Sequence, residues 1–190
     1  MQRKSKNSYF ISDTLSQKIS ETKNSQGVFA VCKMKNENIS LKTGQKYIAL
    51  DNLQDPGNLG TVIRTAEALG ISSVIVGGGC DVFNPKVLRA SMGSVLRLDV
   101  FECQSLAPVL QKAKSLGIKT YATSPDSSAK KINETQFPKS SLCVIGNEAN
   151  GVSDEVLNIC DETVTIPMLG RAESLNAHVA GAIVMWEMLR

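Results

Sequence analysis

Short apolar runs alternate with segments of helical periodicity along most of this 190-residue chain. The apolar runs predict strands at residues 47–50, 73–76, 95–101, 119–123, 142–145 and 163–166. The segments between and after them predict helices at residues 61–69, 85–92, 106–116 and 177–189, with a short one beginning at residue 153. Strands that alternate with helices in this way predict an α/β fold, with a mostly parallel sheet and helices on both of its faces.

Polar stretches predict the connections between these elements. Residues 51–60 contain Pro, Gly and Asn and predict a turn-forming loop, while residues 126–140 predict a long polar excursion. The helix at 61–69 is expected to end at Gly70. Asn84 followed by proline predicts an N-cap and the first helical position of the next helix.

The final predicted helix is apolar on nearly every side, with Val179, Ile183 and Trp186 among its large residues. Such a helix must be buried, either in the core of its own chain or against a second subunit. Ser174 or Asn176 is the predicted N-cap of this helix.

The first 45 residues differ from the rest. Leu15 and Ile19 stand at helical spacing within residues 9–25, and residues 27–33 predict a strand, followed by a polar linker at 36–45. Residues 1–50 hold nine Lys or Arg and three Asp or Glu, although the net charge of the whole chain is only +3. A basic arm on a mildly acidic body suggests a polyanionic partner such as nucleic acid, and an ordinary solvated tail is the alternative.

Composition excludes several classes of protein. The chain has no run of about 18 apolar residues and its first ten residues lack the apolar core of a signal peptide, so a cytoplasmic location without membrane contact is expected. Its five cysteines form no C-x-x-C pair, which indicates neither a zinc site nor a disulfide framework. The single histidine, His178, cannot support a two-histidine metal site, so metal-independent chemistry is favoured.

Common catalytic motifs are missing as well. The sequence has no G-x-x-x-x-G-K-[ST] phosphate loop, and the glycines at 77–79 do not match G-x-G-x-x-G. It has no nucleophile elbow either. Hydrolysis of nucleoside triphosphates and conventional dinucleotide binding are therefore disfavoured.

Five polar residues remain as candidates for catalysis. They lie in loops or near helix starts, where open α/β sheets place their ligand sites: Asn58, Arg64, Glu148, Ser174 and Asn176. Taken singly, each has a simpler interpretation, as a surface arginine, an exposed loop carboxylate or a helix cap. Only their occurrence together supports a shared site.

Three segments of the sequence carry a family resemblance. Asp55-Pro-Gly-Asn-Leu-Gly-Thr-Val-Ile-Arg-Thr-Ala66, Ile145-Gly-Asn-Glu-Ala-Asn-Gly151, and Ile166-Pro-Met168 with Glu173-Ser-Leu-Asn176 resemble motifs 1, 2 and 3 of the SpoU (TrmH-like) branch of the SPOUT RNA methyltransferases. The resemblance spans residues 46–190. Two departures stand out: Ala-His-Val-Ala at 177–180, where the family usually has Val-Ser-Val-Ala, and Asn147.

The resemblance implies a catalytic domain at residues 46–190 with a C-terminal trefoil knot, and a homodimer. Residues 9–34 are similar to the end of the family's N-terminal RNA-binding domain, so residues 1–45 are interpreted as a remnant of it. The implied cofactor is S-adenosyl-L-methionine, with Gly146, Ile166 and Leu175 lining its pocket and Thr123, Met168 and Asn176 beside it. The implied substrate is structured RNA.

The implied reaction is methyl transfer to a ribose 2′-hydroxyl. The family's proposed base stands at the position of Arg64, yet a guanidinium stays protonated in proteins. Arg64 either loses a proton transiently or only orients the phosphate and the hydroxyl, and we favour orientation. Glu148 then positions Arg64 or the RNA, Asn58 supports the loop, and Ser174 and Asn176 bind the reacting region.

The basic arm and the likeness to members that act on ribosomal RNA favour 23S rRNA as the substrate. Three alternatives stay open at this point. They are ribose methylation of tRNA, methylation of a base, and a non-catalytic RNA-binding dimer that uses the same fold.

Overall fold

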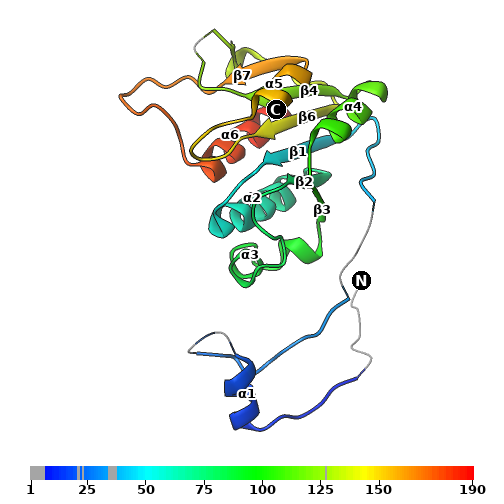
Figure 1. Cartoon of the computed structure of the whole chain (residues 1–190), viewed down its shortest axis with the longest axis vertical. Coiled ribbons are helices and arrows are strands. Elements are labelled where there is room, and N and C mark those ends of the chain that lie inside the picture. The colour runs from blue at the N-terminus through cyan, green and yellow to red at the C-terminus, as the bar shows by residue number, and fades with distance from the viewer. Residues whose placement is uncertain (1–6, 21, 23, 34–37, 127) are drawn as a thin grey trace. The chain divides into compact units, whose positions relative to one another are not determined.

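The computed structural model describes residues 7–20, 22, 24–33, 38–126 and 128–190, and the chain divides into two units, Met1–Asn36 and Glu37–Arg190 (Figure 1). The first unit contains α1 (Asp13–Ile19), which confirms the predicted helix and begins at Ser12, whose hydroxyl accepts a hydrogen bond from the Leu15 N–H. The predicted strand at 27–33 is wrong. These residues pair with no strand in the described part of the chain, and Val28 and Val31 are exposed.

The second unit is built on a parallel sheet. Its strands are β1 (Lys46–Asp51), β2 (Ser73–Gly77), β3 (Asp99–Cys103), β4 (Lys119–Thr123), β5 (Lys130–Lys131), β6 (Ser141–Ile145) and β7 (Glu162–Thr165). Within the described residues the order is β3-β2-β1-β6-β4-β7-β5, and every neighbouring pair is parallel. The predicted α/β class is therefore confirmed.

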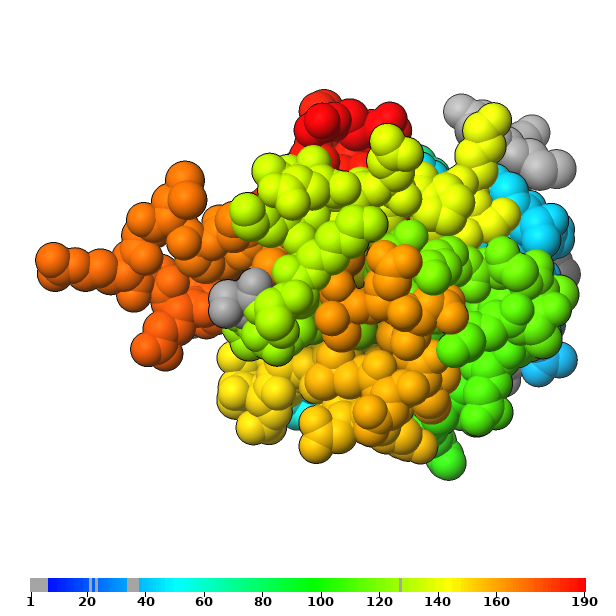
Figure 2. Space-filling view, turned by 90° about the horizontal axis from the view of Figure 1, so that it is seen from above, coloured from blue at the N-terminus to red at the C-terminus, as the bar shows by residue number. Residues whose placement is uncertain are grey.

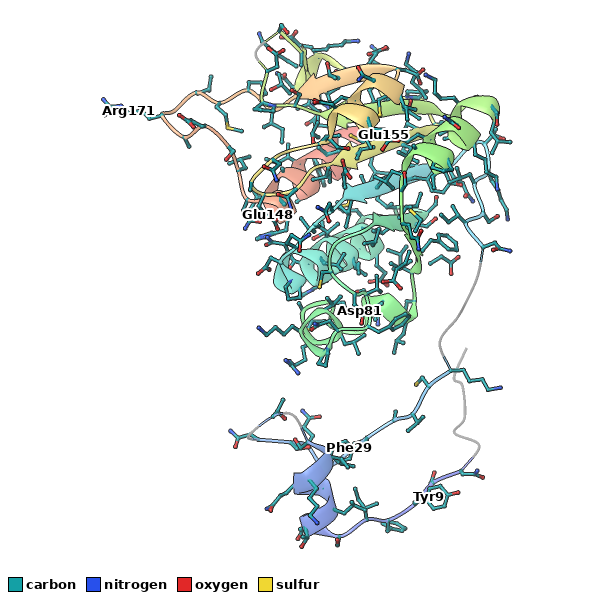
Figure 3. All side chains as sticks on the ribbon, viewed as in Figure 1. Tyr9, Phe29, Asp81, Glu148, Glu155 and Arg171 are labelled. Carbon is teal, nitrogen blue, oxygen red and sulfur yellow. The ribbon has the colours of Figure 1, made fainter. Side chains whose placement is uncertain are left out.

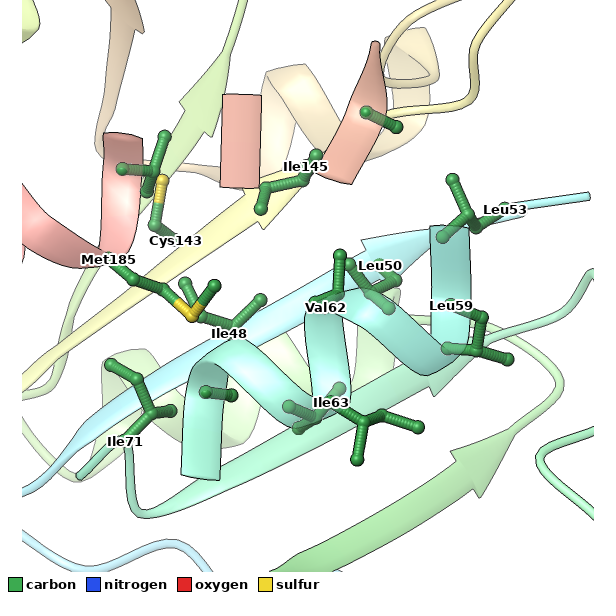
Figure 4. Packing of buried hydrophobic residues seen from close by; sticks show 14 of the residues in the cluster. Ile48, Leu50, Leu53, Leu59, Val62, Ile63, Ile71, Cys143, Ile145 and Met185 are labelled. Atoms are coloured by element: carbon green, nitrogen blue, oxygen red, sulfur yellow. The ribbon is translucent and has the colours of Figure 1, made fainter. Parts of the chain in front are cut away.

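Helices cover both faces of this sheet. They are α2 (Pro56–Leu69), α3 (Pro85–Ala90), α4 (Ala107–Ser115), α5 (Asp154–Ile159) and α6 (Ala177–Leu189), with 3-10 turns at Ser94–Leu96 and Ile132–Glu134. Alternate residues of β1 point to opposite faces, as the pleat requires. Ile48 and Leu50 join the core beneath α2 and α6 (Figure 4), while Tyr47 and Ala49 join the core beneath α4 and α5.

Helix α6 lies close against α2 and β6 because of a glycine. A Cβ atom on Gly181 would stand 3.0 Å from the Cδ1 atom of Ile145 and 3.5 Å from the Cγ2 atom of Val62. The far end of α6 is also attached, since the Lys46 Nζ donates a hydrogen bond to the Met188 carbonyl. The final helix is thus held against the first β-α unit of the body.

Burial of α6 is incomplete. Ala177, Gly181, Val184, Met185 and Met188 are buried in the core of this chain, whereas the sequence predicts burial on nearly every side of the helix. Trp186 is 62% exposed, so this chain alone does not cover the opposite side. No helix in the described ranges is long and apolar enough to cross a membrane.

The structure corrects three predicted boundaries. Helix α2 begins at Pro56, five residues before the predicted start, because the Asp55 carboxylate accepts a hydrogen bond from the Asn58 N–H and proline occupies the first turn. The predicted strand at 95–101 is a 3-10 turn followed by β3. The excursion at 126–140 contains β5 and the buried Ile132, which packs into the core.

Candidate active site

Three neighbouring strands end at one edge of the sheet and bring separate loops together. Because β6, β4 and β7 are adjacent and parallel, their carboxyl ends place Gly146, Thr123 and Ile166 side by side. The Thr123 hydroxyl donates to the Val144 carbonyl at 3.1 Å, and the Ser124 N–H donates to the Val164 carbonyl at 2.9 Å. Three of the predicted cofactor-binding residues therefore share one edge.

The loop after β6 is a closed turn. Asn147 and Gly151 exchange two backbone hydrogen bonds of 2.9 Å, and the Asn147 side-chain oxygen accepts from the N–H groups of Ala149 and Asn150. The amide nitrogen of Asn147 donates to the Asn52 carbonyl at 2.8 Å, which attaches this loop to the loop after β1. Asn147, noted in the sequence only as a departure, thus shapes the motif 2 loop.

Gly146 is required by space. A Cβ atom at this position would overlap the backbone of Gly151 and Val152, which fold back over it. No other residue leaves room for this close approach of two backbone segments. The result is a turn made largely of backbone groups directly after a buried strand.

Asn58 connects the motif 1 helix to the motif 2 loop. It lies in the first turn of α2, is only 8% exposed, and donates from Nδ2 to the Oε1 atom of Glu148 at 2.8 Å. The Oδ1 atom of Asn58 lies 3.0 Å from the Nδ1 atom of His178 in α6. Figure 3 shows Glu148 beside the beginning of α6. One buried amide therefore joins three segments that are far apart in sequence.

Asn176 is the N-cap of α6, because its side-chain oxygen accepts a hydrogen bond from the His178 N–H at 2.9 Å. This decides between the two caps that the sequence left open. Ser174 is exposed in the preceding loop and makes no hydrogen bond with any described residue. Leu175 is half-buried, and Met168 is 38% exposed. That loop extends outward from the body (Figure 2), with Arg171 at its tip (Figure 3).

Arg64 lies apart from this hydrogen-bonded group. It is the ninth residue of α2, in the middle of the helix and not in its first turns, because the helix starts at Pro56. Its side chain is exposed, and among the described residues it forms no hydrogen bond or ion pair. A guanidinium that is accessible and not neutralised by a described carboxylate is available to a phosphate group.

The structure has open depressions at the surface, and they do not coincide with the predicted cofactor pocket. One depression of about 460 Å³ is bordered by Ile132, Ile166, Leu169 and Ile183. Of the predicted cofactor-binding residues, Ile166 borders it, while Gly146, Thr123 and Leu175 do not. The convergence of loops at the sheet edge follows from the strand order and lies apart from this depression except at Ile166.

The cysteines near this edge of the sheet are protonated thiols. Burial raises the pKa of the Cys143 thiol, and burial with the nearby Asp161 raises the pKa of Cys160 to about 12, so both thiols stay protonated. Among the described residues, no three His, Cys, Asp or Glu side chains are grouped so that they could hold a metal ion.

Sequence reasoning found Asn58, Glu148 and Asn176, and the structure brings them together with His178. It missed the roles of His178 and of Asp51, whose carboxylate accepts from the N–H and the hydroxyl of Ser153 at 2.8 and 2.7 Å. The signal for Asp51 was its place directly after the predicted buried strand at 47–50, and it is the last residue of β1 in the structure.

A parallel α/β sheet whose carboxyl-edge loops carry the motif 2 and motif 3 segments, next to the start of the last helix, is the arrangement that the SPOUT resemblance implies. The chain belongs to the SpoU rRNA Methylase family, whose sequence profile matches residues 45–186. The resemblance of the three motifs to this family is therefore confirmed.

Individual relatives agree with this assignment. The chain is 37% identical over 181 residues to the 23S rRNA (guanosine(2553)-2'-O)-methyltransferase RlmP of Bacillus subtilis. The aligned region covers 95% of this chain and 71% of that protein. It is 34% identical over 148 residues to the 23S rRNA (uridine(2479)-2'-O)-methyltransferase of Streptomyces viridochromogenes. That aligned region covers 75% of this chain and 52% of the other protein.

Solved structures give the same result. The SpoU methyltransferase AviRb from Streptomyces viridochromogenes, in complex with the cofactor AdoMet, has a TM-score of 0.71 at 33% identity and covers 78% of this chain. The AdoMet-bound rRNA methyltransferase from Sinorhizobium meliloti has a TM-score of 0.72 at 33% identity and covers 79%. This chain spans 61% and 57% of those two chains.

Proposed function

We propose that this protein transfers a methyl group from S-adenosyl-L-methionine to a ribose 2′-hydroxyl of 23S rRNA. The observation that carries the proposal is the hydrogen bond from Asn58 to Glu148, which joins two of the family's motif segments at the sheet edge. The two ribosomal-RNA relatives described above support this choice of substrate. With that substrate, the protein works in the cytoplasm.

The sheet edge fits the cofactor. A turn of backbone groups after β6, an apolar residue after β7 and the half-buried Leu175 together offer hydrogen-bonding groups and an apolar wall. Gly146, Ile166 and Leu175 are proposed to line the cofactor pocket, with Thr123, Met168 and Asn176 beside them. When bound, this cofactor supplies an electrophilic methyl group on a sulfonium.

Arg64 is proposed to act on the RNA and not as a base. A guanidinium keeps its proton in proteins, but its planar donors bind a phosphate bidentately. Holding the phosphate fixes the neighbouring ribose, and correct orientation of reacting atoms lowers the barrier substantially. The exposed position of Arg64 on α2 suits contact with a large substrate.

The remaining candidates support this geometry. Glu148 is held by Asn58 and is proposed to position Arg64 or the RNA, because an ionised carboxylate accepts hydrogen bonds from both. Asn58 keeps the motif 2 loop in place. Ser174, which is exposed, is proposed to bind the reacting region together with Asn176.

A homodimer through α6 is also part of the proposal. Val179, Ile183 and Trp186 follow one another at helical spacing and form an outward stripe, of which Trp186 is the most exposed member. Exposed apolar surface of this kind marks interaction sites. We further expect the C-terminal trefoil knot of the family, and contact of the basic arm at residues 1–45 with RNA.

Methylation mapping tests the function. Ribose methylation of 23S rRNA is compared between cells with and without the gene, and the purified full chain is incubated with labelled cofactor and 23S rRNA or tRNA. We expect one ribose methylation in 23S rRNA to depend on the gene. Label in tRNA alone would make the protein a tRNA methyltransferase, and RNA binding without any label would make it a non-catalytic binding protein.

A further inference from the structure

His178 is the only histidine of the chain and stands where the family usually has serine. It lies in the first turn of α6, half-buried, with its Nδ1 atom 3.0 Å from the Oδ1 atom of Asn58. Its backbone N–H is bound by the Asn176 side chain, so the helix cap does not depend on the imidazole ring. The imidazole ring therefore makes its hydrogen bond to Asn58 independently of the helix cap.

The chemistry of the three side chains fixes the direction of each hydrogen bond. An ionised carboxylate only accepts, so Asn58 must turn its Nδ2 group toward Glu148, as the 2.8 Å contact shows. The Oδ1 atom of Asn58 then faces His178, and this oxygen also only accepts. The Nδ1 atom of His178 must therefore carry the proton and donate it.

We propose that His178 is a positioning residue for methyl transfer: its Nδ1–H group locks the Asn58 amide, which in turn holds the Glu148 carboxylate at the site. This inference rests on the proposed function. His178 acts through Asn58 and Glu148, and one pair of hydrogen bonds links motif segments 1 and 2 to the first turn of α6.

The burial of Asn58 makes its hydrogen bond with His178 hard to replace. Asn58 is only 8% exposed, so water cannot readily replace the imidazole as the donor to Oδ1. Without that donor a nearly buried oxygen loses its partner, which is costly, and the amide is free to rotate. Glu148 is exposed in its loop, and Asn58 supplies the hydrogen bond that fixes its side chain among the described residues. Loss of His178 therefore misplaces Glu148 without removing it.

Nitrogen NMR tests the proton's position without any need for activity. Because the chain has a single histidine, labelling with ¹⁵N-histidine gives one imidazole to assign. At about pH 9, where imidazoles are neutral, we expect the Nδ1–H tautomer in the wild-type chain and a shift toward the usual Nε2–H tautomer in Asn58→Ala. The exposed Glu155→Gln on α5 serves as the control and should leave the tautomer unchanged. An Nε2–H tautomer in the wild type would overturn the inference.

Kinetics with a conservative variant test the function of the contact. The side-chain nitrogen of asparagine occupies the place of the histidine Nδ1, so His178→Asn keeps the donor, whereas His178→Phe keeps a ring and removes it. We expect His178→Phe to lower kcat about tenfold, by the loss of one buried hydrogen bond, with cofactor affinity unchanged, and His178→Asn to restore most of it. Equal kcat values for wild type and His178→Phe would refute the role of His178. If the wild type methylates no RNA, the proposed function fails, while the NMR result still decides the contact.

Discussion

The amide of Asn58 and the carboxylate of Glu148 meet across 2.8 Å although the two residues lie 90 positions apart. This contact attaches the first turn of α2 to the loop after β6, and Arg64 lies on the same helix as Asn58. The helix therefore places a fixed amide at its start and an accessible guanidinium in its middle.

Arg64→Ala should bind the cofactor normally and lose methyl transfer by about 10²-fold or more, since correct orientation and charge stabilisation of the RNA would be lost. Calorimetry measures cofactor binding and label incorporation measures transfer. Arg97→Ala is the matched control, because Arg97 is an exposed arginine whose partner is Glu67. Transfer at the wild-type rate by Arg64→Ala would contradict both interpretations of this residue.

Leu175→Glu should abolish cofactor binding, because a charge in the apolar wall of the pocket loses its hydration without gaining a partner. Isothermal calorimetry is the measurement. Leu116→Glu, at an exposed leucine after α4, is the control and should bind as the wild type does. Unchanged affinity in Leu175→Glu would remove this residue from the proposed pocket.

Gly146→Ala should lower the free energy of unfolding by about 3 kcal/mol or more, because its methyl group would overlap the backbone of Gly151 and Val152. Gly170→Ala is the matched control, since a Cβ atom there meets nothing within 4 Å. Denaturant unfolding should place this control within about 0.5 kcal/mol of the wild type. Similar stabilities for the two variants would show that the turn after β6 is looser than described.

Trp186→Glu should convert the proposed dimer into a monomer, because a charged side chain would replace the most exposed residue of the apolar stripe on α6. Sedimentation velocity gives the mass in solution. Leu96→Glu alters another exposed apolar residue, outside α6, and should leave the mass unchanged. A monomeric wild type, or a dimeric Trp186→Glu, would exclude this interface.

Asp161→Asn should destabilise the protein at neutral pH and less in acid. Burial raises the pKa of Asp161, but hydrogen bonds from the Thr120 N–H and hydroxyl, at 2.8 Å each, and from Lys114 outweigh burial, so the pKa lies below its ordinary value. A carboxylate with a lowered folded-state pKa contributes stability above its unfolded pKa and loses it as the pH falls through the folded pKa.

We therefore expect Asp161→Asn to cost about 1–2 kcal/mol at pH 7, with the difference from wild type shrinking below about pH 4. Denaturant unfolding at several pH values measures this. The exposed Glu155→Gln should show a small and constant difference. A pH-independent cost for Asp161→Asn would mean that packing, and not charge, holds this contact.

Strands β1, β2, β4, β6 and β7 were predictable because short runs rich in apolar residues mark them, and β4 has the predicted bounds. The start of α2 was not, because Asp55-Pro56 serves equally well in a turn and at a helix start, and only the Asn58 N–H decides between them. Strand β5 consists of two exposed lysines and shows no alternation of apolar and polar residues that would predict a strand. It is defined only by its parallel pairing with β7.

The site was predictable residue by residue only through the family motifs. Nothing in local periodicity connects Asn58 to His178, which lies 120 positions further on. That contact depends on where α6 docks, and docking depends on Gly181, Val62 and Ile145, which read in the sequence as ordinary apolar positions. Tertiary packing therefore determines which residues meet at the site, whereas the sequence alone indicates only which residues are candidates.

The attachment of α6 to the first β-α unit has a consequence during protein synthesis. Lys46 in β1 donates a hydrogen bond to the Met188 carbonyl, 142 positions later. Strand β1 pairs with β2 on one side and with β6, which comes much later in the chain, on the other. A nascent chain emerging from the ribosome therefore carries one unpaired edge of β1 until β6 has been made, and one uncovered face of α2 until α6 has been made. Such contacts form slowly and leave aggregation-prone surface exposed meanwhile.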